Sequence, residues 1–224
     1  MDLSYEIKYS DRKTVNISVE RDRKVVVRAP NGLSEQKIYE LVEQKKFWLY
    51  EKVNHFQKYP KEPKTKEFVS GESIMYIGKN YKLDIVPEQF EDVKFSNKFS
   101  ISRTNHARAS ELLKQWYITK AKEKIIQKAK FYSKNLGVKF NQVKIVDNKY
   151  RWASCTLNDN INFSWRIIKA PNFVIDYLIV HELTHLLEAN HTQHFWNIIS
   201  IQIPKYPKAK EWLKVNGSIL EEDL

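Results

Sequence analysis

Sixteen residues near the C-terminus, HELTHLLEANHTQHFW at 181–196, hold four of the chain's six histidines and two glutamates. In a helix of about 3.6 residues per turn, His181 and His185 lie one turn apart on one face, so both imidazoles can reach a single cation. Glu182 is turned by about 100° from them, which suits a base that contacts a water molecule beside the metal. The spacing therefore predicts a metal centre for hydrolysis, with Glu182 as the general base.

The flanks of this motif weigh against a chance match. The apolar residues YLIV precede it and two leucines follow His185, which indicates a buried helix. Two imidazoles and a carboxylate in a buried helix need partners that offset their loss of hydration. The flanking residues thus favour a metal site.

A third ligand is required, because a catalytic zinc is held by three protein ligands and keeps a fourth position for water. Four side chains are candidates: Glu188, His191, His194 and Glu211. We favour His191, because Asn190 tolerates the left-handed conformation that ends helices, and a turn there directs the next side chain back to the metal. His194 and Glu211 stay open as alternatives, whereas Glu188 is better placed to orient a ligand or to stay in solvent than to bind the metal.

The cysteine count limits the kind of metal site. Cys155 is the only cysteine, so a site with several thiolates is excluded, and histidine and carboxylate must hold the ion. We expect Zn2+, although nitrogen and oxygen ligands of this kind also accept other divalent ions.

The charge balance bears on partners. There are 38 Lys and Arg residues against 27 Asp and Glu, a formal charge of +11, which favours contact with polyanions. Because the lysines are spread along helix faces and loops, we interpret most of them as solvated and keep nucleic acid as an alternative partner. No apolar run approaches the ~20 residues that cross a bilayer, and the N-terminus lacks a signal-peptide core. We therefore expect no membrane contact and a cytoplasmic location.

The periodicity along the chain predicts an α+β fold. The expected elements are, in order, strands at 5–10, 14–20 and 24–30, a helix from the N-cap Ser34 to about residue 55, a lysine- and proline-rich linker at 58–68, a hairpin at 73–86 that turns at Gly78-Lys79-Asn80, a long helix at 107–136 ended by Gly137, strands at 143–146 and 161–165, and a helix that begins at Pro171-Asn172. The last of these helices carries the histidine motif.

Several stretches together resemble the YgjP-like metallopeptidase domain family, often described as M48-type metal-dependent hydrolases. They are VVVRAP, the W-x-x-x-K of 48–52, SGESIMYIGKNYKL, YRWASC, INFSWRIIKAP and YLIVHELTHLLEANHTQHFW, which span nearly the whole chain. The combination is far more specific than the histidine motif alone. The last stretch is also similar to the SprT group, whose members cut proteins on DNA.

The resemblance implies a zincin-like hydrolase domain at 106–224 with a small antiparallel sheet, preceded by a β-rich region at 1–105 that has one helix and a hairpin. It also implies His181, His185 and His191 as zinc ligands and Glu182 as the base. His194 is then expected to lie outside the ligands, where it supports one of them or faces the substrate.

Four further residues lie in segments that we expect beside the site. Arg151 or Ser154 can stabilise a developing oxyanion, but we favour structural support for the RWASC segment; Cys155 is not expected to be a nucleophile, because the metal site already supplies one. The strand INFSW, which contains Asn162, is expected to form a wall of the cleft, since zincins bind extended peptides along an edge strand.

Three functions remain open at this point. The first is a peptidase that acts on a protein or peptide. The second is a metal-dependent hydrolase of a small anionic substrate such as a nucleoside triphosphate. The third is a non-catalytic module with a structural zinc, which the presence of Glu182 argues against, because a structural site needs no base.

Overall fold

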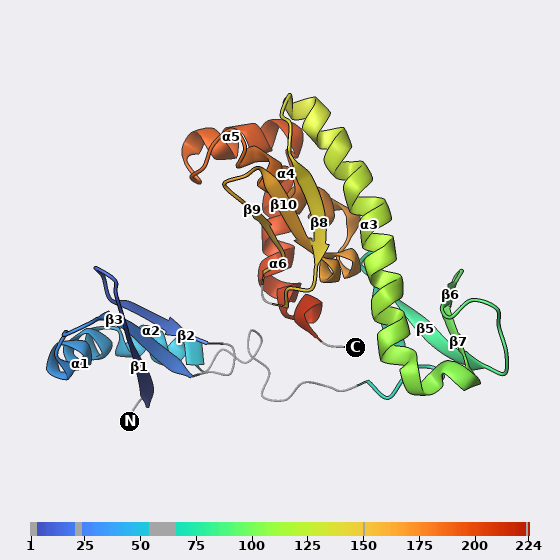
Figure 1. Ribbon diagram of the computed structural model, residues 1–224, viewed down its shortest axis with the longest axis horizontal. Helices are drawn as coiled ribbons and strands as arrows, with labels where there is room; N and C mark the ends of the chain where they lie inside the picture. The colour runs from blue at the N-terminus through green and yellow to red at the C-terminus, as the bar shows by residue number, and fades with distance from the viewer. Residues whose placement is uncertain (1–3, 21–23, 54–65, 150, 223) are drawn as a thin grey trace. The chain divides into compact units, whose positions relative to one another are not determined.

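The computed structural model describes residues 4–20, 24–53, 66–149, 151–222 and 224 (Figure 1). The chain divides into two compact units, residues 1–63 and residues 64–224. The second unit contains the histidine motif. None of the helices within the described ranges combines the length and the apolar character needed to cross a bilayer.

The first unit is a three-stranded sheet that shares a core with two helices. Its elements are β1 (Tyr5–Ser10), β2 (Asn16–Val19), β3 (Val25–Pro30), α1 (Glu35–Gln44) and α2 (Lys46–Val53). The central strand β3 pairs parallel with β1 and antiparallel with β2. Its residues Val25 and Val27 pack in one core with Ile38, Val42 and Leu49 of the helices.

The expected strands of this unit and the N-cap Ser34 are confirmed. The expected single helix is divided instead at Lys45, which has left the helical conformation at φ −105° and ψ 6°. Residues 54–55 of that helix and residues 58–65 of the expected linker lie outside the described residues.

The second unit combines two sheets with four α-helices within its described residues. Its elements are β4 (Ser73–Tyr76), β5 (Lys79–Val86), β6 (Lys94–Phe95), β7 (Phe99–Ser102), the 3-10 helix η1 (Arg103–Arg108), α3 (Ala109–Leu136), β8 (Gln142–Val146), β9 (Ala153–Cys155), β10 (Asn160–Ser164), the 3-10 helix η2 (Trp165–Lys169), α4 (Asn172–Thr184), α5 (Gln193–Gln202) and α6 (Tyr206–Glu221). The fold is therefore α+β, as the sequence predicts.

The expected boundary after residue 105 differs from the division after residue 63. The reason is that the sheet β4-β5-β7-β6 shares one hydrophobic core with α3 and α4. Tyr117 of α3 also donates a hydrogen bond from its hydroxyl to the carbonyl of Met75, at 2.6 Å. The hairpin and its neighbouring strands thus belong to the unit that contains the histidine motif.

The hairpin between β4 and β5 turns one residue earlier than expected. Its two central residues are Ile77 and Gly78, both with positive φ, at 48° and 76°, the conformation of a tight turn between twisted strands. The backbone N–H groups of both residues donate to carbonyls of η2, those of Ile168 and Lys169. These contacts place the turn directly before α4.

The long helix α3 matches the expected helix closely. Its predicted apolar positions Leu113, Tyr117, Ala121 and Ile125 are buried, and Gly137 ends it in the left-handed conformation at φ 67°. Three of its lysines pair with acidic residues: Lys114 with Asp147, Lys120 with Glu123 and Lys128 with Asp176. Part of the positive charge is thus neutralised within the fold.

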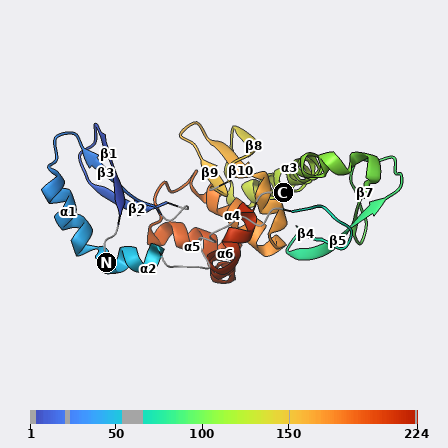
Figure 2. The same cartoon turned by 90° about the horizontal axis from the view of Figure 1, so that it is seen from below.

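The sheet beside the motif has the order β8-β10-β9, and it is mixed rather than antiparallel. β10 pairs antiparallel with β9, to which a short turn joins it, and parallel with β8. Figure 1 shows this sheet in front of α4, with α3 along the β8 side, and Figure 2 shows α4, α5 and α6 grouped together. The sheet and these helices share the hydrophobic core against which α4 packs.

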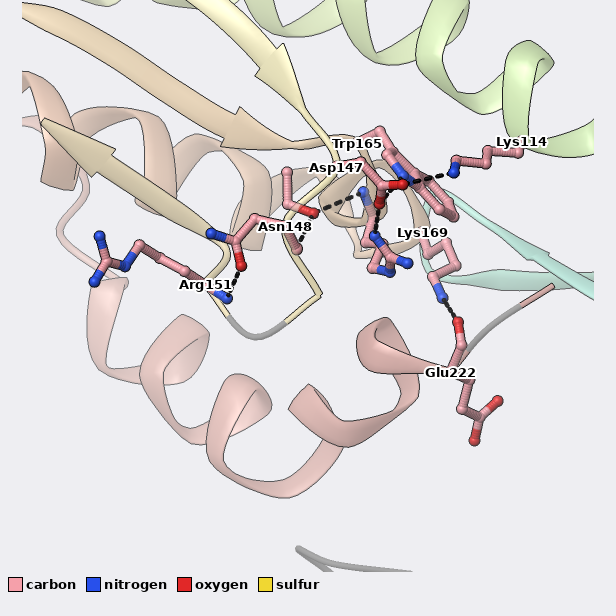
Figure 3. A network of polar contacts seen from close by, with 9 residues as sticks. Lys114, Asp147, Asn148, Arg151, Trp165, Lys169 and Glu222 are labelled. Carbon is pink, nitrogen blue, oxygen red and sulfur yellow. Dashed lines mark hydrogen bonds and ion pairs between the residues drawn. The ribbon is translucent and has the colours of Figure 1, made fainter. Parts of the chain in front are cut away.

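A polar network fixes the end of β8 (Figure 3). Asp147 accepts hydrogen bonds from the indole Nε1 of Trp165, at 2.9 Å, and from the guanidinium of Arg166. The ammonium group of Lys114 lies 2.5 Å from its other carboxylate oxygen. One carboxylate therefore links α3, the end of β8 and η2.

Candidate metal centre

Helix α4 carries the first two histidines and the glutamate. It begins after Pro171, as expected, and nine of its residues are buried, from Val174 to Thr184. His181 and His185 lie one turn apart with ring centroids 5.0 Å apart. Because the helix ends at Thr184, His185 is its C-cap, but a φ of −63° and a ψ of −17° keep it close to helical geometry.

His191 comes to this pair from the connection between α4 and α5. One ring nitrogen from each of His181, His185 and His191 lies within 4.8 Å of the other two. The Nε2 atoms of His181 and His191 are 3.0 Å apart. Three nitrogens directed at one point can hold a single ion.

The turn that brings His191 back is not the one expected. Asn190 does not have a positive φ, so the prediction of a left-handed turn at this residue is wrong. The chain reverses instead through a hydrogen bond from the N–H of Thr192 to the carbonyl of Asn190, at 2.8 Å. The hydroxyl of Thr192 then caps α5 by accepting from the N–H of Phe195.

The second ring nitrogens of the α4 histidines have their own contacts. Nδ1 of His181 lies 3.4 Å from the hydroxyl of Tyr177, and Nδ1 of His185 lies 3.2 Å from the carbonyl oxygen of Glu188. A ring that donates from Nδ1 leaves Nε2 free as a metal ligand. Glu188 thus orients a histidine, as expected, but through its backbone rather than its carboxylate.

The electrostatics of the site favour the neutral form of His181 and His185. Burial, together with the neighbouring His185, His191 and Lys210, lowers the pKa of His181 to about 3. Burial also lowers the pKa of His185. Neutral imidazoles are the form that binds metal. Three ring nitrogens within 4.8 Å of one another fit a zinc ion that retains one open position.

Glu182 is buried beside these histidines, with a side chain of only 7% exposure. Burial raises the pKa of its carboxyl to about 7, against the lowering effects of a hydrogen bond from the backbone of Cys155 and of the charge on Arg151. A carboxyl group that titrates near neutrality suits a general base. Because the N–H of Cys155 donates this hydrogen bond, β9 lies next to Glu182.

The other expected site residues do not join the group of three histidines, although the charge of Arg151 acts on Glu182. Arg151 is exposed, and in Figure 3 its side chain extends away from Asp147. Ser154 and Asn162 face each other across β9 and β10, and the amide of Asn162 donates to the hydroxyl of Ser154 at 3.4 Å. His194 is exposed at the start of α5, outside the group of three histidines.

Glu211 also lies outside that group. It is exposed on α6, and its carboxylate is 3.9 Å from the ammonium group of Lys214. Of the four candidates for a third ligand, the described structure brings His191 alone to His181 and His185.

The expectation that INFSW forms an edge strand is wrong. β10 is the middle strand, so its backbone is bonded on both sides. The N–H of Ser164 donates to Trp152 and that of Thr156 donates to Asn160, and backbone groups alternate along a strand. Ala153 and Cys155 of β9 therefore direct their backbone groups to the free edge of the sheet.

Aromatic residues around the histidines were missed by sequence reasoning. Tyr177 lies four residues before His181, so the helical spacing that predicts His185 also indicates Tyr177. Trp196 stacks on His191, and Tyr206 of α6 stacks on Trp196. No local signal marks Tyr206, because it reaches the site only through tertiary packing.

Three clustered histidine nitrogens beside a buried glutamate fit the class of metal-dependent hydrolases, and comparison with known families identifies the protein further. Residues 13–216 match the YgjP-like metallopeptidase domain, and the chain belongs to this family. The matched region extends over both compact units. No curated protein matches the sequence.

Two solved structures resemble parts of the chain. The metallopeptidase zymogen abylysin of Pyrococcus abyssi is 20% identical, with a TM-score of 0.39 over 45% of this chain and 98% of its own. The metallopeptidase zymogen jannalysin of Methanocaldococcus jannaschii is 21% identical, with a TM-score of 0.35 over 42% of this chain and 96% of its own. The assignment of the chain to the YgjP-like metallopeptidase family rests on the family match, which spans most of the chain.

Proposed function

We propose that this protein is a zinc-dependent, zincin-like metallopeptidase in which His181, His185 and His191 hold the metal and Glu182 is the general base. One observation carries the proposal: the three ring nitrogens lie within 4.8 Å of one another beside a buried glutamate. The family supports protein or peptide as the substrate class.

The chemistry divides between the metal and the chain. When bound, zinc polarises the scissile carbonyl and acidifies a water molecule. Glu182 accepts the proton of the attacking water and returns it to the leaving amine. Its burial keeps bulk water from competing for that proton, and its contact with the backbone of Cys155 holds the carboxylate toward the free edge of β9.

That free edge is the proposed docking strand for substrate. Apart from the N–H of Cys155, which donates to Glu182, the backbone groups that Ala153 and Cys155 direct to this edge can add an extended peptide to the sheet. Because Cys155 also contacts Glu182, a peptide on this edge passes next to the base. The edge therefore aligns a scissile bond with the catalytic residues.

Three variants test the assignment. We expect Glu182→Gln to retain zinc but lose peptidase activity by at least about 100-fold, because the base is removed while the three nitrogens stay. His185→Ala should lose both zinc and activity. His194→Ala is the matched control, a histidine of the same segment that should keep both.

Zinc content and hydrolysis are measured in parallel, with and without chelator. The substrates are a casein, a DNA-bound protein and nucleoside triphosphates, so that peptidase activity and hydrolysis of a small anion are separated. Full activity in Glu182→Gln, or hydrolysis of triphosphates alone, contradicts the proposal.

A further inference from the structure

A column of aromatic rings connects His191 to His181 by a path that does not pass through the metal position. His191 stacks on Trp196 with centroids 5.7 Å apart, and Trp196 stacks on Tyr206 at 5.5 Å and 17°. Tyr206 stacks on Tyr177 at 6.3 Å and 19°, and the edge of Tyr177 meets His181 at 5.7 Å. The three aromatic rings thus form a continuous chain of contacts from one histidine to the other.

The column joins three helices that are separate in sequence. Tyr177 belongs to α4, Trp196 to α5 and Tyr206 to the first turn of α6. Lys210, one turn further along α6, places its ammonium group 4.1 Å from the centroid of Trp196. The same ring is therefore contacted from α6 by a stacked tyrosine and by a lysine.

His191 needs such support more than the other two histidines. His181 and His185 are held by α4, whereas His191 is exposed in the connection before α5. The rings of Phe195 and Trp196 lie 4.6 Å and 5.7 Å from its own ring. The position of His191 therefore depends on packing rather than on a helix.

We propose that Tyr177, Trp196 and Tyr206 are positioning residues that hold His191 in register with His181, so that the three-nitrogen site is preformed. This inference rests on the proposed metal centre. Tyr177 has a second part in it, because its hydroxyl meets Nδ1 of His181 and so directs Nε2 of that ring toward His191.

The expected effect follows from the size of such contacts. An aromatic pair contributes about a factor of two to ten in an equilibrium beyond its burial, and loss of a partner outside the ligand shell weakens metal binding by about 10- to 100-fold. Tyr206 makes two stacking contacts. Its removal should therefore weaken zinc binding by about tenfold.

The test compares Tyr206→Leu with Tyr206→Phe. Leucine fills much of the volume but cannot stack, whereas phenylalanine keeps the ring and loses only the hydroxyl. We expect about tenfold weaker zinc affinity for the first and less than about twofold change for the second. Trp212→Ala is the matched control, because Trp212 packs against the core from the same helix but lies outside the column.

Zinc affinity is measured by competition with a chelator, and the geometry is followed in the absorption spectrum of the Co2+ form. Tyr206→Leu should change that spectrum, whereas Trp212→Ala should lower the melting temperature and leave the spectrum unchanged. Equal zinc affinity in Tyr206→Leu and the wild type overturns the inference.

A double-mutant cycle separates this inference from the proposed function. If Tyr206 acts through His191, Tyr206→Leu has no further effect on zinc affinity in a His191→Ala background. Additive losses overturn the positioning role while leaving the metal centre intact. Unchanged zinc affinity in His191→Ala overturns both the ligand set and the column.

Discussion

Glu182, the proposed general base, shows how burial of a carboxyl group can weaken the fold that holds it. Its carboxyl has a pKa raised from an ordinary 4.5 to about 7 by burial. Between these pH values the folded, metal-free protein binds more protons than the unfolded chain. Its free energy of unfolding therefore falls as the pH rises. The full loss of stability from burying the charged carboxylate is present above pH 7.

Glu182→Gln should accordingly stabilise the metal-free protein. We expect its free energy of unfolding to rise by roughly 2–3 kcal/mol near pH 8 and to match the wild type near pH 4.5, because a neutral amide has no charge to bury. Urea unfolding of the variant and the wild type at the two pH values measures this difference in the free energy of unfolding.

The control is Glu211→Gln, a change of the same kind at an exposed glutamate of α6. It should alter the free energy of unfolding by less than about 0.5 kcal/mol. Equal stability of Glu182→Gln and the wild type near pH 8 would show that burial of this charge is not costly.

At the scale of elements, the turn between β4 and β5 supports the start of α4, the helix that carries His181. A Cβ added to Gly78 would lie 2.6 Å from Cγ and 2.9 Å from Cα of Pro171, and the φ of Gly78 is +76°. We expect Gly78→Ala to destabilise the protein by about 2–4 kcal/mol, through backbone strain and the clash together. It should also weaken zinc binding, because Pro171 precedes α4.

Gly71→Ala isolates the strain from the clash. Gly71 also has positive φ, at +93°, but a Cβ there meets nothing within 4 Å. We expect a cost of about 1–2 kcal/mol and unchanged zinc affinity. Chemical denaturation and zinc competition measure both variants, and equal effects at the two glycines would rule out the contact with Pro171 as a cause.

The cap of α5 is the second element on which the site depends. Thr192→Val removes the hydroxyl that accepts from the N–H of Phe195 and should cost about 1 kcal/mol of stability. It should also weaken zinc binding, because His191 is the preceding residue. Ser34→Ala removes the N-cap of α1 and should cost a similar amount without any change in zinc affinity, as measured by the same competition.

At the scale of the molecule, the network around Asp147 couples stability to pH. Burial by itself would raise the pKa of Asp147, but hydrogen bonds from Lys114, Arg166 and Trp165 outweigh this and hold the pKa well below its usual range. The unfolded chain then binds more protons in acid. The stability from this network is present above about pH 4 and is lost as the pH falls further.

Asp147→Asn should lower the free energy of unfolding by about 1–2 kcal/mol at neutral pH. The carboxylate is 44% exposed, which reduces its contribution, whereas loss of its charge leaves the buried Arg166 without this partner. The difference from the wild type should shrink below pH 4 in acid titrations of unfolding. A constant difference across that range would contradict the role of the charge.

Local spacing explains what sequence reasoning predicted well. His181, Glu182 and His185 lie within one and a half turns of one helix, so their relative directions follow from helix geometry alone. The same holds for α3, whose buried positions and terminal Gly137 match the sequence pattern. Such features depend on neighbours within a few residues.

The sequence by itself therefore determined the placement of the proposed ligand pair and the proposed base on one helix, and most elements of the fold. Only the tertiary structure decided how His191 returns without a left-handed Asn190, that β9 and not β10 offers a free edge, and that Tyr206 joins the site. The physical reason is that strand order and ring stacking depend on packing between residues far apart in the chain, for which helical or strand periodicity carries no information.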